Sequence, residues 1–102
     1  MAGSIISSSQ AKDHIGEGDT GVAGFVKQVY ERSGNMYVSF QTDKPHQGFV
    51  GMIPQADIDA AGGWLFLNSL PGQFVAITGK IQKQNGAAQI VVREKKQFLV
   101  AQ

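Results

Sequence analysis

The sequence predicts an all-β fold, a small five-stranded Greek-key barrel with two short helices. Apolar and polar residues alternate with a period of two in several short segments, as in strands with one buried face. Thirteen glycines are spread along the 102 residues without a repeat, which indicates turns and kinked strands. An Asn-Gly pair separates two of the alternating segments, and such a pair is a strong hairpin signal because both central residues need positive φ.

The first helix is predicted from its ends, after a tail of residues 1–5. Ser7 and Gln10 have the spacing of a capping box, in which each side chain reaches a backbone N–H at the other position. Residues 11–15 would then form one or two helical turns. Gly16 fits the left-handed position that ends a helix.

Two strands follow this short N-terminal helix. The first is expected from Thr20 to Glu31, and Gly24 in its middle predicts a bulge or a sharp coil, which a strand shared by both sides of a barrel needs. Residues 33–35 form a turn. The second strand covers residues 36–41, where apolar and polar side chains alternate strictly.

The third strand and the second helix are expected next. Phe49 to Ile53 alternates as a strand, and Pro54 then begins a segment that suits a short helix to Ala61. The Gly62-Gly63 pair is expected to end that helix. The apolar run Trp64 to Leu67 is interpreted as a plug for one end of the core.

The last two strands form a hairpin. The fourth covers residues 74–81, the turn is Gln84-Asn85-Gly86, and the fifth runs from Ala88 to Arg93. Gln97 to Val100 is a candidate edge strand. Three strands, one helix and a two-stranded hairpin describe the five-stranded OB-fold Greek-key barrel, here with a short N-terminal helix and a short helix between strands three and four.

Composition limits the class of protein. The chain has no cysteine, which excludes disulfides and thiolate metal sites, and residues 6–102 are expected to form a single domain. Formal net charge is +1, but residues 1–78 carry −3 and residues 79–102 carry +4, so positive charge gathers near the C-terminus. The compartment is left open: cytoplasmic if Met1 is native, periplasmic if a signal peptide was removed.

Five segments resemble a known family, and together they cover most of the chain from Ile6: residues 6–17, 21–26, 37–49, 70–81 and 89–92. They are similar to a bacterial OB-fold domain that occurs alone, in lipoproteins and beside nuclease-like modules. That family is related to the nucleic-acid-binding OB superfamily. The resemblance implies an OB barrel, and Gln73 departs from it where the family tends to have lysine.

The expected ligand is single-stranded nucleic acid, bound weakly and without strong sequence preference. OB barrels bind such strands across strands two and three, using aromatic faces for bases and cations for phosphates. If Val38 and Phe40 point inward, Tyr37 points outward on that face. The alternatives without a ligand are that Tyr37 only packs against side chains of the neighbouring strands and that the cations are ordinary solvated surface charges. The candidate phosphate contacts are Lys27, Arg32, Lys44, Lys80, Lys83 and Arg93.

A second reading is a protein-interaction or homo-oligomeric assembly domain without a nucleic-acid ligand. Its candidate surfaces are the edge formed by Gln97 to Val100 and the face that carries Phe25. Catalysis is not expected, because His14 and His46 lie on different elements without an evident acid or nucleophile partner. No cofactor and no metal are expected either, since neither a phosphate loop nor a metal-ligand spacing occurs.

Overall fold

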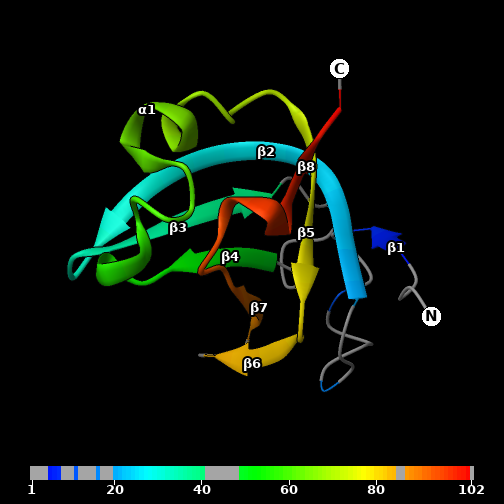
Figure 1. Cartoon of the computed structure of the whole chain (residues 1–102). Helices are drawn as coiled ribbons and strands as arrows, with labels where there is room; N and C mark the ends of the chain where they lie inside the picture. Colours follow the sequence, from blue (N-terminus) through cyan, green and yellow to red (C-terminus); the bar gives the residue numbers. More distant parts are fainter. Residues whose placement is uncertain are drawn as a thin grey trace.

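The computed structural model describes residues 5–7, 11, 16, 20–40, 49–84 and 87–101, and strands dominate that part of the chain (Figure 1). The strands are β1 (Ile5–Ser7), β2 (Thr20–Arg32), β3 (Asn35–Phe40), β4 (Phe49–Ile53), β5 (Phe74–Gly79), β6 (Gln82–Gln84), β7 (Ala87–Val91) and β8 (Phe98–Val100). The helical elements are the 3-10 turns η2 (Gln55–Asp57) and η3 (Lys95–Gln97) and the helix α1 (Gly63–Asn68). No helix in these ranges has the length and apolar character needed to cross a bilayer.

The strands form a single curled sheet, and the chain itself closes it into a barrel. The order along the sheet is β6-β7-β4-β3-β2-β5-β8, with β1 added to β2 in parallel. β5 pairs with β2 near one end of this order, whereas β6 pairs with β7 at the other end. Only Lys80 and Ile81 separate β5 from β6, so this segment connects the two sides. The predicted all-β OB-type barrel is confirmed, its fourth strand being β5 and β6 together.

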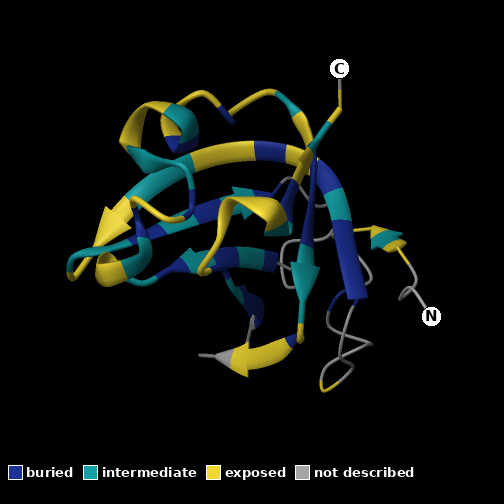
Figure 2. Ribbon diagram, viewed as in Figure 1, coloured by how far each residue is buried: buried dark blue, intermediate teal, exposed yellow. Residues whose placement is uncertain are grey.

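The core lies inside this curl and follows the predicted alternation. Alternate residues of β3 and of β4 are buried, whereas β5 is buried at three consecutive residues, Val75 to Ile77, and β2 is buried mainly in its first half (Figure 2). Because successive side chains of a strand point to opposite faces, one face of each strand fills the barrel and the other is available for binding. The largest fully buried side chains are Phe49, Met36, Ile53, Leu67, Leu70, Ile77, Ile81 and Ile90.

The bulge in β2 lies at Lys27, not at Gly24 as predicted. Gly24 stays in regular register with Val75 of β5. The register shifts instead between Val26 and Gln28, opposite β3. The physical reason is the change of partner: the first half of β2 pairs with β5 and the second half with β3, and the extra residue lets the strand coil where it passes from one to the other.

The helical segment between β4 and β5 is also displaced from the prediction. The region after Pro54 forms the 3-10 turn η2, and the α-helix begins only after Gly62, which is its N-cap at a φ of 118°. The glycine pair therefore starts a helix rather than ending one. The apolar run from Trp64 to Leu67 does not plug the core as a unit, because consecutive helical residues point in different directions. Leu67 is fully buried, whereas Leu65 is 91% exposed.

The two ends of the chain differ in how far they match the prediction. Ile5, assigned to a tail, is the first residue of β1 and pairs with Gly21, and Ser7 belongs to the same strand. Most of the predicted N-terminal helix, residues 8–10 and 12–15, lies outside the described residues, as do His14 and His46. So does the Asn85-Gly86 turn, but Gln84 pairs with Ala87 across it, which confirms a two-residue hairpin. The expected edge strand is β8, which pairs with β5.

One glutamine fastens the C-terminal segment to the barrel. The Oε1 atom of Gln97 accepts hydrogen bonds from the backbone N–H groups of Arg93 and Glu94, at 2.8 and 3.2 Å. Its Nε2 atom donates to the carbonyls of Thr78 and Val91, at 2.9 and 3.1 Å. A single side chain thus joins β5, β7 and η3 where β5 and β7 diverge.

Candidate nucleic-acid interface

The outward faces of β2, β3 and β4 carry a row of aligned side chains. Tyr37 of β3 pairs with Tyr30 of β2 on one side and with Met52 of β4 on the other. Paired residues of neighbouring strands share a face of the sheet. Tyr37 is half-buried and adjoins the fully buried Val38, so its ring lies on the outer surface, as the alternation predicted.

Tyr30 and Tyr37 form an aromatic platform. Their rings are stacked, with centroids 5.3 Å apart and planes within 14°. The guanidinium carbon of Arg32 lies 5.9 Å from the centroid of the Tyr30 ring, at the distance of a cation–π contact. We call these three residues the tyrosine platform. It places two π-systems and a cation side by side on the outer face of the barrel.

Tyr30 was not among the predicted site residues, and the bulge explains why. In the first half of β2 the even-numbered residues, such as Val22 and Val26, are buried. The extra residue at Lys27 reverses this alternation, so Tyr30 points outward with Tyr37. A reader of the sequence who continued the first pattern would place Tyr30 inside. Only knowledge of the bulge position could have shown its true direction.

A second row of outward residues lies beside the platform, two residues away along each strand. It runs across five strands and supplies mainly amide and hydroxyl groups: Gln28, Ser39, Val50, Gln89 and Gln82. Gln89 is only 6% exposed, so the other polar members of the row are the ones open to a ligand. Amides offer both donors and acceptors, so this polar row can bond to bases of more than one kind.

Two of the predicted cations lie close to the platform along β2. Lys27 is the exposed bulge residue, and Arg32 belongs to the platform itself. Lys44 lies outside the described residues. The structure therefore brings together Tyr37, Arg32 and, further along the same strand, Lys27.

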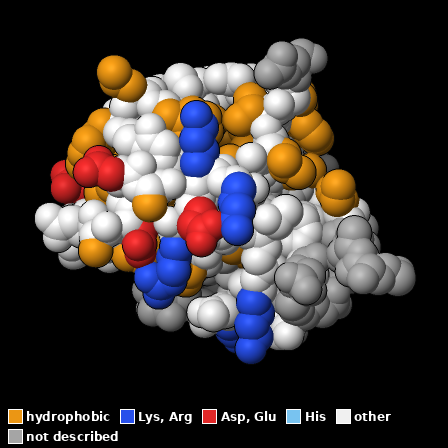
Figure 3. All heavy atoms as spheres, in the orientation of Figure 1, with side chains coloured by type: hydrophobic (Ala, Val, Ile, Leu, Met, Phe, Trp, Pro, Cys, Tyr) orange, Lys and Arg blue, Asp and Glu red, His pale blue; other side chains and the backbone are white. Residues whose placement is uncertain are grey.

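The other predicted cations divide between two ends of the sheet. Lys80 lies between β5 and β6, and Lys83, on β6, pairs with Ala88 near the start of β7; both are exposed. Arg93 follows the opposite end of β7 and is paired: its Nη1 atom lies 2.8 Å from Oδ2 of Asp57. Figure 3 shows Lys and Arg side chains interspersed with acidic side chains on one face of the molecule, and the Nζ atom of Lys96 lies 3.1 Å from Oε2 of Glu94. The excess of charge seen in the sequence is therefore not one continuous positive surface.

Comparisons with known proteins support the fold alone. No protein-family model matches the chain, and no curated protein is significantly similar to it in sequence. An asparaginyl-tRNA synthetase structure from Pyrococcus horikoshii matches with a TM-score of 0.62 at 11% identity, over 95% of this chain and 23% of that one. A protein of Leishmania major Friedlin assigned as an aspartyl-tRNA synthetase matches with a TM-score of 0.59 at 6% identity, over 94% and 20%.

These matches have limited reach, because the chain spans only about a fifth of each synthetase. They agree with an OB-type barrel, which is the fold implied by the family resemblance. Membership of the bacterial family stays a prediction. Both neighbours are named as enzymes, but the small share of each that is covered does not carry their activity to this chain, so the absence of catalysis also stays a prediction.

Proposed function

We propose that this chain is a small OB-fold module that binds single-stranded nucleic acid across the outer face of β2, β3 and β4. The observation that supports it is the tyrosine platform, two stacked rings with a guanidinium beside them on the face that OB barrels use for oligonucleotides. Stacking accepts every base because each base has a π-face. The ligand class is therefore single strands, in which bases are free to stack.

The recognition would combine stacking, a few phosphate contacts and adaptable hydrogen bonds. A base placed on the platform extends the stack that Tyr30 and Tyr37 already form, at about 1–3 kcal/mol per stacked base. Arg32 and Lys27, both on β2, are the cations best placed to contact the phosphate backbone of the nucleic acid. The amide and hydroxyl groups of the polar row beside the platform can hydrogen-bond to the edges of different bases. Little sequence preference is therefore expected. So few cations imply weak, salt-sensitive binding.

Arg93 contributes only at a cost. Its ion pair with Asp57 must open before the guanidinium can reach a phosphate. Because the Arg93 side chain is 65% exposed, that pair is weak and opening it is feasible. Arg93 is therefore assigned a secondary role, behind Arg32.

The test is a fluorescence-anisotropy titration with labelled homopolymers of about 15 nucleotides, the upper range of an OB-fold site. The two structural neighbours are named as tRNA synthetases, which makes RNA a sensible first probe, with DNA as the second. Binding is expected at about 50 mM salt and should weaken roughly sevenfold by about 200 mM, as two phosphate contacts to a single strand predict. Absence of binding to both polymers at low salt would contradict the proposal.

A pair of matched variants locates the site. Tyr37→Ala should weaken binding about 5- to 150-fold, the equivalent of one stacked base. Trp64→Ala removes an aromatic that is 46% exposed on α1, an element that carries no residue of the platform, and should leave the affinity unchanged. Equal losses from the two variants would show that the platform is not the binding site.

A further inference from the structure

A different surface of the barrel exposes large apolar side chains. Ile5 of β1, Phe25 of β2, Phe74 of β5 and Leu99 of β8 are each between 43% and 65% exposed. Phe25 and Phe74 pair across their strands and meet edge to face, with ring centroids 5.1 Å apart. Figure 3 shows hydrophobic side chains gathered on the side where β5 and β8 lie. Gathered on neighbouring strands, they form a patch rather than isolated surface residues.

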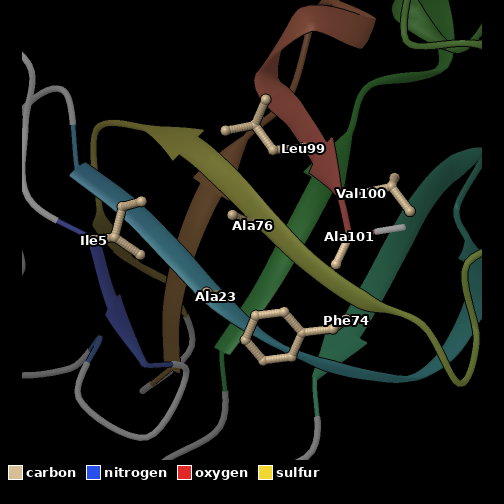
Figure 4. A pocket seen from close by; sticks show the side chains of 7 residues that line it. All are labelled: Ile5, Ala23, Phe74, Ala76, Leu99, Val100 and Ala101. Carbon is tan, nitrogen blue, oxygen red and sulfur yellow. The ribbon is translucent and has the colours of Figure 1, made fainter.

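A groove of about 250 Å³ runs through this surface (Figure 4). Small residues, Ala23 and Ala76, lie in its middle, and the larger side chains of Ile5, Phe74 and Leu99 stand around them. The full lining is Ile5, Ala23, Phe74, Ala76, Leu99, Val100 and Ala101. Every one of these side chains is apolar, so nothing in the groove selects a charged or strongly polar ligand.

The groove adjoins an open sheet edge. β8 is the last strand in the sheet order, and among the described strands it pairs with β5 alone. The N–H of Ala101 donates to the carbonyl of Phe74, 2.9 Å away. Since backbone groups of an antiparallel strand alternate in direction, those of Val100 point away from β5. An edge with which no described strand pairs, beside exposed apolar side chains, favours association with another chain.

We propose that this surface binds a second copy of the chain, in a two-fold symmetric dimer. A two-fold interface must be complementary to itself, and this surface offers both projecting side chains and a recess floored by alanines. The lining carries no charge, so two copies meet without repulsion of like charges. A partner that is recognised through charge would require charged side chains in the lining, and this lining has none.

The area available agrees with a weak, reversible dimer. Four large side chains, each about half exposed, present roughly 100 Å² apiece. With the smaller lining residues and the edge of β8, each copy could bury about 500–600 Å², near the lower limit of specific interfaces. The tyrosine platform lies on other strand pairs, so this dimer stands independently of the proposed nucleic-acid function.

The experiment is sedimentation velocity of the full chain over a wide concentration series. The expected result is a reversible shift from monomer to dimer with increasing concentration. Leu99→Lys, at an exposed groove residue, should raise the dimer dissociation constant at least about tenfold while the circular dichroism spectrum is unchanged. The matched control is Leu65→Lys on α1, the most exposed large apolar residue described, which should dimerise normally.

Several outcomes would overturn the proposal. The proposal is wrong if the wild-type chain stays monomeric at the highest concentration. It is also wrong if Leu65→Lys abolishes the dimer and Leu99→Lys leaves it intact. A monomer that dimerises only after residues 1–4 are deleted would assign the groove to the chain's own N-terminal segment. Unchanged oligonucleotide affinity in Leu99→Lys is also required, because a loss there would mean that the groove belongs to the nucleic-acid site.

Discussion

Gly79 is the point at which the closure of the barrel can be tested by a single methyl group. It is the last residue of β5, just before the segment that carries the chain to β6. Its φ is +148°, a conformation that residues with a side chain rarely adopt. A Cβ atom there would lie 2.7 Å from Cγ2 of Ile90 and 3.3 Å from Nε2 of Gln97. Ile90 is fully buried, so it cannot move aside without disturbing the core.

The expected loss of stability for Gly79→Ala follows from three contributions. Backbone strain costs about 1–3 kcal/mol. Crowding against the buried Ile90 costs about 1–3 kcal/mol. The lower entropy of the unfolded alanine chain returns about 0.4–1 kcal/mol. The net loss is about 1–6 kcal/mol out of the roughly 5–15 kcal/mol of a typical domain, which lowers Tm by at least about 4 °C.

Urea unfolding followed by circular dichroism measures this loss, with Gly72→Ala as the control. Gly72 also has a positive φ, +85°, but a Cβ atom there meets no other atom within 4 Å. The control therefore carries the strain without the crowding, and a loss of about 1 kcal/mol is expected. Equal losses at the two positions would refute the reasoning, because they would show that Gly79 does not approach Ile90 closely in solution.

Three further predictions follow from individual contacts. Gln97→Ala removes four hydrogen bonds that join β5, β7 and η3, and should lower the free energy of unfolding by about 2–4 kcal/mol in urea titrations. Asp57→Asn weakens an exposed ion pair, so stability should change by less than about 1 kcal/mol. The same variant frees Arg93, and the salt dependence of oligonucleotide binding should steepen by about 0.7 in log–log slope. Tyr30→Phe should keep the oligonucleotide affinity of the wild type in anisotropy titrations, whereas Tyr30→Ala should lose it as Tyr37→Ala does, because only the ring is needed for stacking.

β3 and β4 were predictable because burial has a period of two in both of them. β4 was predicted with the bounds it has, and the alternation in β3 placed Tyr37 on the outer face before its surroundings were known. This information is local, since a strand with one buried face must alternate wherever it sits in the fold. The two-residue hairpin was predictable for the same reason, from the turn chemistry of Asn-Gly.

The charge pairing was not predictable, because it joins residues distant in sequence. Arg93 is a free cation in the sequence and a partner of Asp57 in the structure, 36 residues away. Nothing near Arg93 in the chain signals that partner. The helix start at Gly62 was missed for a related reason: a glycine pair is compatible with either end of a helix, and the neighbouring packing of Leu67 decides which.

The bulge at Lys27 connects the fold with both proposed surfaces. Before it, β2 turns Phe25 outward beside Phe74 of β5, and after it, the same strand turns Tyr30 outward beside Tyr37 of β3. One extra residue thus lets a single strand present aromatic side chains over two different strand pairs. Because the two surfaces lie on different strand pairs, Tyr37→Ala should alter only oligonucleotide binding and Leu99→Lys only self-association. The double variant should show both losses added together, and a departure from additivity would mean that the two surfaces are coupled through β2.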